Sequence, residues 1–127
     1  MGSNSNSNIT DYSKAIKRLL RELASEAYEK ELFLELAKLD RSFAEWRAGK
    51  IGSGELSYRI HQYETGASRK LFIQYNEGKN DFNVAYAIVT GILDRKEIPV
   101  ELIEAIENQI SFYETQMEAG ELRLPGE

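Results

Sequence analysis

Residues 55–72 (ELSYRIHQYETGASRKLF) gather the side-chain types that acid–base or phosphate chemistry uses. They include the single histidine of the chain, His61, together with Tyr58 and Arg69. Residues three or four apart share a helix face, so Tyr58 lies beside His61 if this stretch is helical. If the chain turns at Gly66, Arg69 folds back toward His61. The three side chains then form a cluster that can transfer a proton or hold a phosphate, as in a small enzyme or a ligand-binding protein.

The same residues also have an interpretation without chemistry. A lone histidine beside aromatic residues usually lies at a helix surface or junction, and an arginine after a turn usually pairs with a nearby glutamate. Some helical nucleases place an arginine and a histidine one or two turns apart on one helix. Here Arg59 and His61 are only two residues apart, and such neighbours point in different directions. The nuclease hypothesis is therefore disfavoured.

A second candidate site is a strip of cations near the start of the first predicted helix. Its members follow one another at steps of three and four residues: Lys14, Lys17, Arg18 and Arg21. Such a strip can contact RNA, DNA or an acidic protein. The alternative is a solvated face with pairs from Asp11 to Lys14 and from Arg18 to Glu22, each contributing about 0.2–0.5 kcal/mol. Repulsion between neighbouring cations costs a similar amount, so pairing alone does not explain the strip, and we predict that it binds a partner.

Metal and cofactor sites are not expected. The chain has no cysteine and one histidine, which leaves no thiolate zinc site, iron–sulfur cluster or multi-histidine centre. A diiron bundle uses Glu-x-x-His pairs, but Tyr58 stands three residues before His61. The loop GKIGSG lacks the glycine spacing and the terminal Gly-Lys-Ser/Thr of nucleotide-binding loops.

Composition sets the class of protein. The 127 residues are 42% hydrophobic and 29% charged, with a net charge of −5, which is typical of a folded, acidic domain. That charge disfavours nucleic acid as a partner, although a local basic patch could still bind it. No apolar run approaches the roughly 20 residues needed to span a bilayer, and no signal peptide is recognisable. We therefore expect a cytoplasmic protein without membrane association.

Hydrophobic residues recur with the helical period along most of the chain. Residues 11–48 contain neither glycine nor proline and predict one long helix, or two that meet within residues 25–30. Four further helices are predicted: 53–66, one that carries Leu71, Phe72 and Tyr75 and stops near Gly78, 81–91, and a long last helix from Pro99 to Met117. No stretch shows the two-residue alternation of a strand. The predicted fold is an all-α, compact bundle of about five helices with long first and last helices.

The predicted domain organisation is a single helical domain over residues 11–120. Residues 1–10 (MGSNSNSNIT) are small and polar, and we predict a disordered tail. Residues 121–127 follow Gly120 and include Pro125, so they are predicted to form a flexible C-terminal tail.

Four stretches resemble a family of small helical bacterial proteins: SKAIKRLLRELASEAYEKELFLELAKL, FAEWRAGKI, ELSYRIHQYETGASRKLFIQY and GILDRKEIPVELIEAI. The resemblance covers residues 13–113. It implies a compact bacterial domain with a fixed pattern of loops and turns, but no activity, ligand or catalytic residue.

The favoured function is that of an interaction or regulatory accessory domain. Five phenylalanines, seven tyrosines and one tryptophan are many aromatic residues for this length, and Tyr and Trp are enriched at interfaces. Most belong to the core or its edge, and a few could mark a partner surface or a dimer face. The partner is expected to be another protein or a second copy, and an antitoxin-like role is one concrete form. The alternatives are a nucleic-acid binder through the basic strip and a small enzyme centred on His61.

Overall fold

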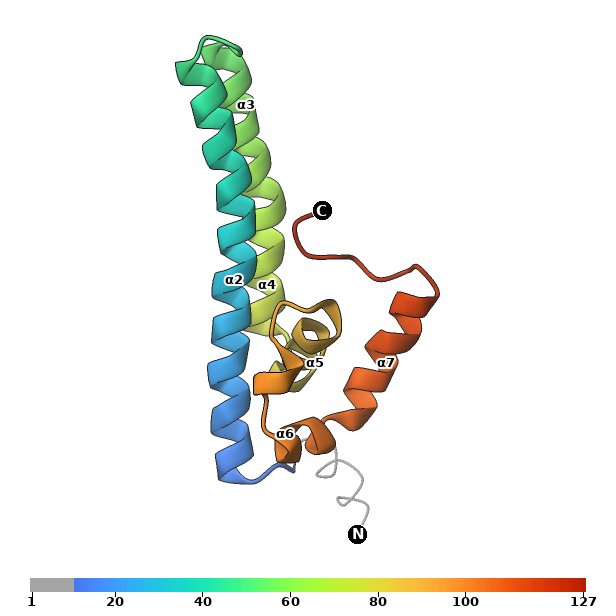
Figure 1. Ribbon diagram of the computed structural model, residues 1–127. Helices are drawn as coiled ribbons and strands as arrows, with labels where there is room; N and C mark the ends of the chain where they lie inside the picture. Colours follow the sequence, from blue (N-terminus) through green and yellow to red (C-terminus); the bar gives the residue numbers. More distant parts are fainter. Residues whose placement is uncertain (1–10) are drawn as a thin grey trace.

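The computed structural model describes residues 11–127. These residues form an all-α bundle and contain no strand (Figure 1). The predicted tail, residues 1–10, lies outside the described residues. The elements in chain order are α2 (Lys14–Arg47), α3 (Ser53–Tyr63), the π-helical turn η1 (Glu64–Ser68), α4 (Arg69–Glu77), α5 (Asn80–Thr90), the 3₁₀ turn η2 (Arg95–Glu97), α6 (Val100–Ala105) and α7 (Glu107–Glu118). The predicted fold class is confirmed. None of these helices is both long enough and apolar enough to cross a lipid bilayer.

Helix α2 is continuous over 34 residues, so it does not break within residues 25–30. It begins at Ser13, whose hydroxyl accepts a hydrogen bond from the backbone N–H of Ile16 at 3.1 Å, as is typical of an N-cap. At 1.5 Å per residue it is about 50 Å long. Helices α3 and α4 return along it to form an antiparallel hairpin, and the far end of this hairpin extends beyond the other helices (Figure 1).

The predicted helix end at Gly66 is wrong. The helix continues from Ser53 to Glu77 and passes through Gly66 as the π-helical turn η1. An isolated glycine costs a helix about 1 kcal/mol relative to alanine but does not by itself end it. Here η1 packs against α2, and its wider turn takes up one extra residue.

The core lies where α5 packs between α2 and α7. Seven of the eleven residues of α5 are buried, which makes it the central helix. Its Ala85 and Ala87, together with Ala24 and Ala27 of α2, are almost fully buried. Small side chains at these positions allow the helix axes to approach closely.

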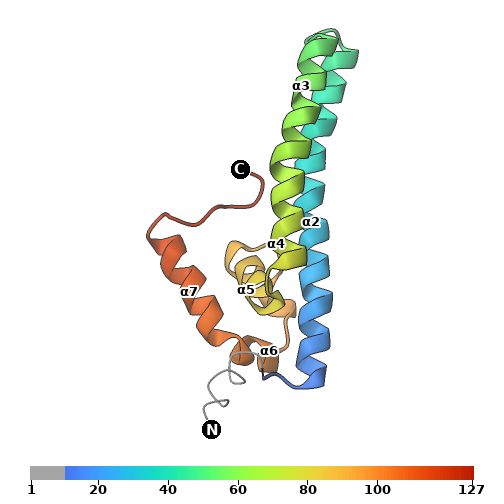
Figure 2. The same ribbon diagram turned by 180° about the vertical axis from the view of Figure 1, so that it is seen from behind.

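The last predicted helix is divided at Ile106, where the backbone leaves helical geometry with φ −114° and ψ 26°. The prediction of one continuous helix over residues 99–117 therefore needs correction. The bend keeps Leu102, Ile106 and Ile110 buried, at 0–3% exposure, on both sides of the break. Beyond α7, residues 119–127 cross back to the hairpin (Figure 2).

Candidate functional site

The predicted cluster around His61 does not form. Tyr58 and His61 are exposed on α3, and Arg69 is exposed at the start of α4. Because the helix runs straight through Gly66, Arg69 lies eight residues further along the same rod, about 12 Å away along its axis. The expectation that Arg69 folds back is therefore wrong, and a role for His61 on its own stays a prediction.

Arg59, the neighbour of His61, ties α3 to α2. Its Nε donates to Glu55 at 2.9 Å, and its Nη1 donates to Glu45 at 2.9 Å and to the Ser42 hydroxyl at 3.1 Å. Both hydrogen-bonded carboxylates raise the pKa of this guanidinium. The most strongly bonded side chain of this stretch thus holds the hairpin together.

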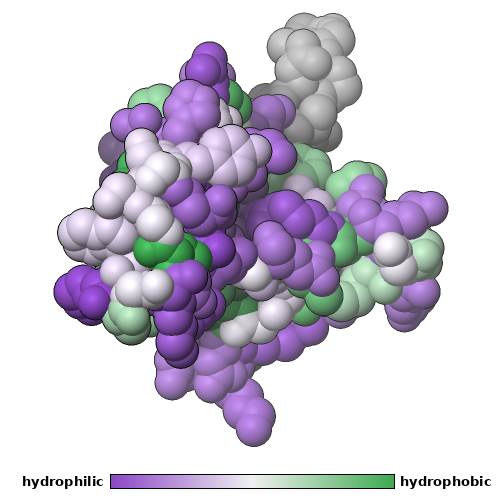
Figure 3. Space-filling view, turned by 90° about the horizontal axis from the view of Figure 1, so that it is seen from above, coloured by the Kyte–Doolittle hydropathy of each residue, from purple (hydrophilic) through white to green (hydrophobic). Residues whose placement is uncertain are grey.

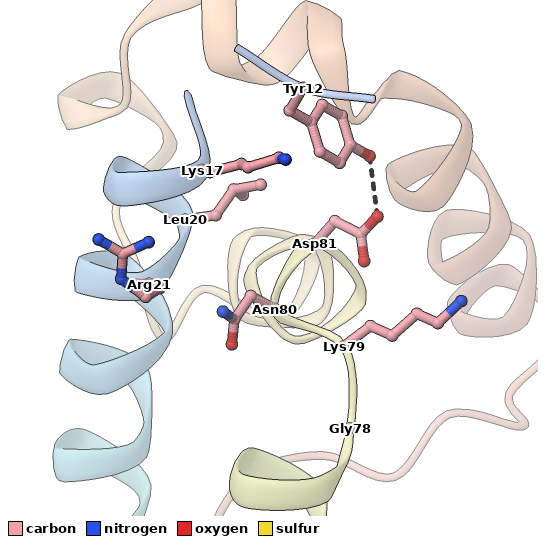
Figure 4. A pocket seen from close by; sticks show the side chains of 8 residues that line it. All are labelled: Tyr12, Lys17, Leu20, Arg21, Gly78, Lys79, Asn80 and Asp81. Carbon is pink, nitrogen blue, oxygen red and sulfur yellow. Dashed lines mark hydrogen bonds between the residues drawn. The ribbon is translucent and has the colours of Figure 1, made fainter. Parts of the chain in front are cut away.

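The basic strip contributes two of its four residues to a cavity of 390 Å³ between α2 and the α4–α5 junction (Figure 4). Lys17 and Arg21 line it from α2, and Lys79 lines it from the junction. Lys14 and Arg18 are exposed on α2 but do not line the cavity. The remaining lining residues are Tyr12, Leu20, Gly78, Asn80 and Asp81.

A second cavity of 230 Å³ continues the first along α2. Arg21 and Asn80 line both, so we treat the two as one depression and call it the cationic groove. Its far part is walled by Tyr28 of α2 and Tyr75 of α4, whose rings stack with centroids 5.1 Å apart. The groove therefore combines cations at one end with an aromatic pair at the other.

Gly78 shapes the junction that carries Lys79. A Cβ atom at this position would collide with the backbone carbonyl oxygen of Gln74, so only glycine fits without a backbone shift. The Asn83 side chain donates to the same carbonyl at 3.0 Å and satisfies one of the last acceptors of α4. The chain consequently turns tightly from α4 into α5, and Lys79 extends from this junction away from Lys17 and Arg21 (Figure 4).

Asp81 is the acidic residue of the groove, and its oxygens are committed to internal hydrogen bonds. It is 4% exposed and accepts from the Tyr12 hydroxyl at 2.8 Å, from the Gln109 amide at 3.1 Å and from the backbone N–H of Phe82 at 2.8 Å. Burial, and next the hydrogen bond to Asp81, raise the pKa of Tyr12 to about 12. Tyr12 thus remains a neutral donor at physiological pH.

The cations of the groove have no carboxylate partner within residues 11–127. The ion pairs of this part of the chain involve none of Lys17, Arg21 and Lys79. They also do not include the pairs predicted from Asp11 to Lys14 and from Arg18 to Glu22. Three cations and one carboxylate, Asp81, therefore line this cavity, and none of the three cations is held in an ion pair within residues 11–127. This excess of positive charge favours an anionic ligand.

Exposed apolar side chains, unlike the cations of the groove, do not gather at one place. Phe33 is 67% exposed beside a cavity that it lines with Leu34 and Ile92, whereas Trp46 and Tyr58 lie on the hairpin, 40% and 56% exposed. Seen from the hairpin end, hydrophobic residues form separate small patches among hydrophilic ones (Figure 3). Most other tyrosines are buried or half-buried, as expected for a core edge.

Comparisons of this chain with protein families, with curated proteins and with solved structures find no match. The resemblance to small bacterial helical proteins gains no support from them.

Sequence reasoning missed Lys79 because it lies 58 residues from Arg21 and reaches the groove only through tertiary packing. A usable signal was present: Lys79 stands between the helix stop at Gly78 and the predicted helix start at Asp81. A lysine between two helices lies where both can pack against a third helix. Lys79 was therefore a candidate neighbour of the basic strip on the first predicted helix.

Proposed function

We propose that this protein is an interaction domain that binds an acidic segment of a partner protein in the cationic groove. The observation that carries this proposal is the meeting of Lys17, Arg21 and Lys79, unpaired with any carboxylate in residues 11–127, in one depression. Charge complementarity of this kind accelerates association and selects partners. A regulatory accessory role in a bacterial cytoplasm, including an antitoxin-like one, is a finer form of the same proposal.

The size of the groove favours a peptide over a nucleic acid. From Lys17 to Tyr28 it follows α2 for eleven residues, or about 16 Å, which suits a short extended segment. A nucleic-acid binder typically carries a broad basic face, whereas this chain has a net charge of −5, which repels a long polyanion.

The uncharged residues of the groove also suit a peptide. Asn76 and Asn80 line its middle and offer amide donors and acceptors to a backbone. The half-buried Tyr28 ring, stacked on the buried Tyr75, offers an apolar surface to a side chain. Carboxylates of the partner would lie at the cationic end, and its next residues would lie against the aromatic pair.

The test is a binding titration with two fluorescein-labelled probes, a hexaglutamate peptide and a twelve-nucleotide single-stranded DNA, followed by anisotropy at two salt concentrations. K17E/R21E removes two groove cations, and K50E/K96E is the matched control because it changes the net charge equally at exposed positions outside the groove. We expect K17E/R21E to weaken peptide binding by about tenfold or more, since each lost pair contributes about 0.2–1 kcal/mol and each reversed charge repels. The control should bind within about twofold of the wild type.

Two results would contradict the proposal. Equal weakening by K17E/R21E and K50E/K96E would show that only the net charge matters. Tighter binding of the DNA than of the peptide, lost in K17E/R21E, would assign the groove to nucleic acid instead.

A further inference from the structure

The C-terminal segment, residues 119–127, packs on the face of the hairpin that carries Glu31 and Gln74. It leaves α7 through Gly120, whose φ of +73° is a left-handed conformation that favours glycine. It then crosses from the end of α7 to α2 and α4 (Figures 1 and 2). The segment predicted as a flexible tail therefore makes specific side-chain contacts.

Arg123 is the centre of these contacts. Its Nη2 donates to Glu31 of α2 at 3.2 Å and to Gln74 of α4 at 3.3 Å. Its guanidinium lies over the Tyr86 ring of α5, 5.0 Å from the centroid, within the range of a cation–π interaction. Three helices thus recognise one arginine by charge, hydrogen bonding and stacking, and we call the set Glu31, Gln74 and Tyr86 the arginine socket.

The socket is built into the protein interior. Glu31 is 2% exposed and Tyr86 is 4% exposed. Glu31 is held from behind by the hydroxyl of Tyr75, which donates to it at 2.5 Å. A carboxylate in this position is costly unless it is paired, and a packed apolar residue would often stabilise the fold as well or better. The buried charge is therefore better explained by recognition than by stability.

The segment that fills the socket is less buried than the socket residues Glu31 and Tyr86. None of its nine residues is buried, and Arg123 itself is about half exposed, with a side-chain exposure of 46%. Its main further tie is the Tyr86 hydroxyl, which donates to the Arg123 carbonyl at 2.6 Å. Segments with few buried contacts open at low free-energy cost, so the socket can be vacated without unfolding the core.

A different groove, which we call the hairpin groove, runs along the hairpin beside the C-terminal segment. Two cavities of 180 and 470 Å³ follow the hairpin between α2 and the helix that contains η1, and Glu35, Ala67 and Glu127 line both. The second cavity reaches Ser42 and Arg59. The C-terminal segment borders the first cavity through Arg123 and Glu127, and it borders the second through Glu127 alone. π-Helical turns such as η1 are frequent at functional sites.

We propose that this hairpin groove is a second docking site, for an extended partner segment that inserts an arginine into the socket of Glu31, Gln74 and Tyr86, and that the C-terminal segment competes for it. The occupant's chemistry follows from the one that the structure contains: an arginine flanked by leucines, in an extended chain. A partner's apparent affinity is then its affinity for the open socket multiplied by the fraction of molecules in which the socket is open. This inference concerns a different ligand from that of the cationic groove, although Tyr75 borders the groove and also bonds Glu31 of the socket.

The experiment uses the full-length protein and a fluorescein-labelled peptide with the sequence of residues 120–127, GELRLPGE, in an anisotropy titration. R123A empties the socket, and R95A is the matched control because Arg95 pairs with Glu114 at the surface. We expect R123A to bind the peptide at least tenfold more tightly than the wild type and R95A to bind like the wild type. A peptide with alanine in place of arginine should lose binding to R123A at least tenfold.

The proposal is overturned if R123A, with a helical circular dichroism spectrum like that of the wild type, binds the peptide no better than the wild type does. It is also overturned if both peptides bind R123A equally. If R123A does not fold, R123K decides, because lysine keeps a cation beside Glu31 but lacks the planar fork that bonds and stacks. A tenfold gain in R123K supports the proposal, and no gain overturns it.

Discussion

The hydrogen bond from Tyr75 to Glu31 provides a sharp test of the described packing. Tyr75→Phe removes one hydroxyl at a site where the ring is 8% exposed and the carboxylate 2% exposed. Glu31 then keeps Arg123 as its remaining partner, and one carboxylate oxygen loses its donor. Hydrogen bonds to charged groups contribute about 1.5–3 kcal/mol. We therefore expect the free energy of unfolding to fall by about 1.5–3 kcal/mol.

The assay is urea unfolding followed by far-ultraviolet circular dichroism at pH 7, with a thermal melt in parallel. For a domain of this size about 4 °C corresponds to 1 kcal/mol, so the melting temperature should fall by about 6–12 °C. Tyr28→Phe is the control, because Tyr28 stacks on the same ring and its hydroxyl forms no hydrogen bond to the described residues. It should change the free energy by less than about 0.5 kcal/mol. If both substitutions lower the free energy of unfolding by the same small amount, the Tyr75 hydroxyl does not stabilise the Glu31 carboxylate and the reasoning is refuted.

Two further predictions concern pH and the α4–α5 junction. Because the pKa of Tyr12 is raised from 10.0 to about 12 in the folded protein, its contribution to stability is full below pH 10 and is lost as the pH rises through about 12. Urea midpoints between pH 8 and 12 should therefore fall less steeply in Tyr12→Phe than in the wild type, and parallel curves would contradict the assignment. Gly78→Ala should lower the unfolding free energy by about 1–3 kcal/mol through the contact with the Gln74 carbonyl. Gly54→Ala, in α3 where a Cβ meets no atom within 4 Å, should not destabilise the protein and should raise the free energy of unfolding by up to about 1 kcal/mol in the same melts.

The helical elements could be predicted from local patterns where those patterns were long. Residues 11–48, without glycine or proline, became α2, because a helical period sustained over many turns has few alternatives. Gly66 misled the prediction, since a glycine ends a helix only when tertiary contacts do not favour its continuation. The bend at Ile106 also has no local signal, because it serves the burial of apolar residues on both sides.

The candidate sites divide in the same way. Lys17 and Arg21 could be found from their spacing, because both lie on one helix. Lys79 joins them through the fold of the α4–α5 junction. The pairing of Glu31 with Arg123 links residues 92 positions apart, and no sequence period relates them. Contacts of that range depend on the packing of whole elements.

The unbroken length of α2 makes the hairpin a lever. Arg21 of the cationic groove and Arg47 at the end of α2 belong to one rod, about 39 Å apart. A partner that tilts the base of this rod by a few degrees displaces its tip by several ångströms, and a load applied at the tip is transmitted back to the base with mechanical advantage. The paired helix of α3, η1 and α4 contacts α2 along the length of the hairpin, so the rod is supported from its base to its tip.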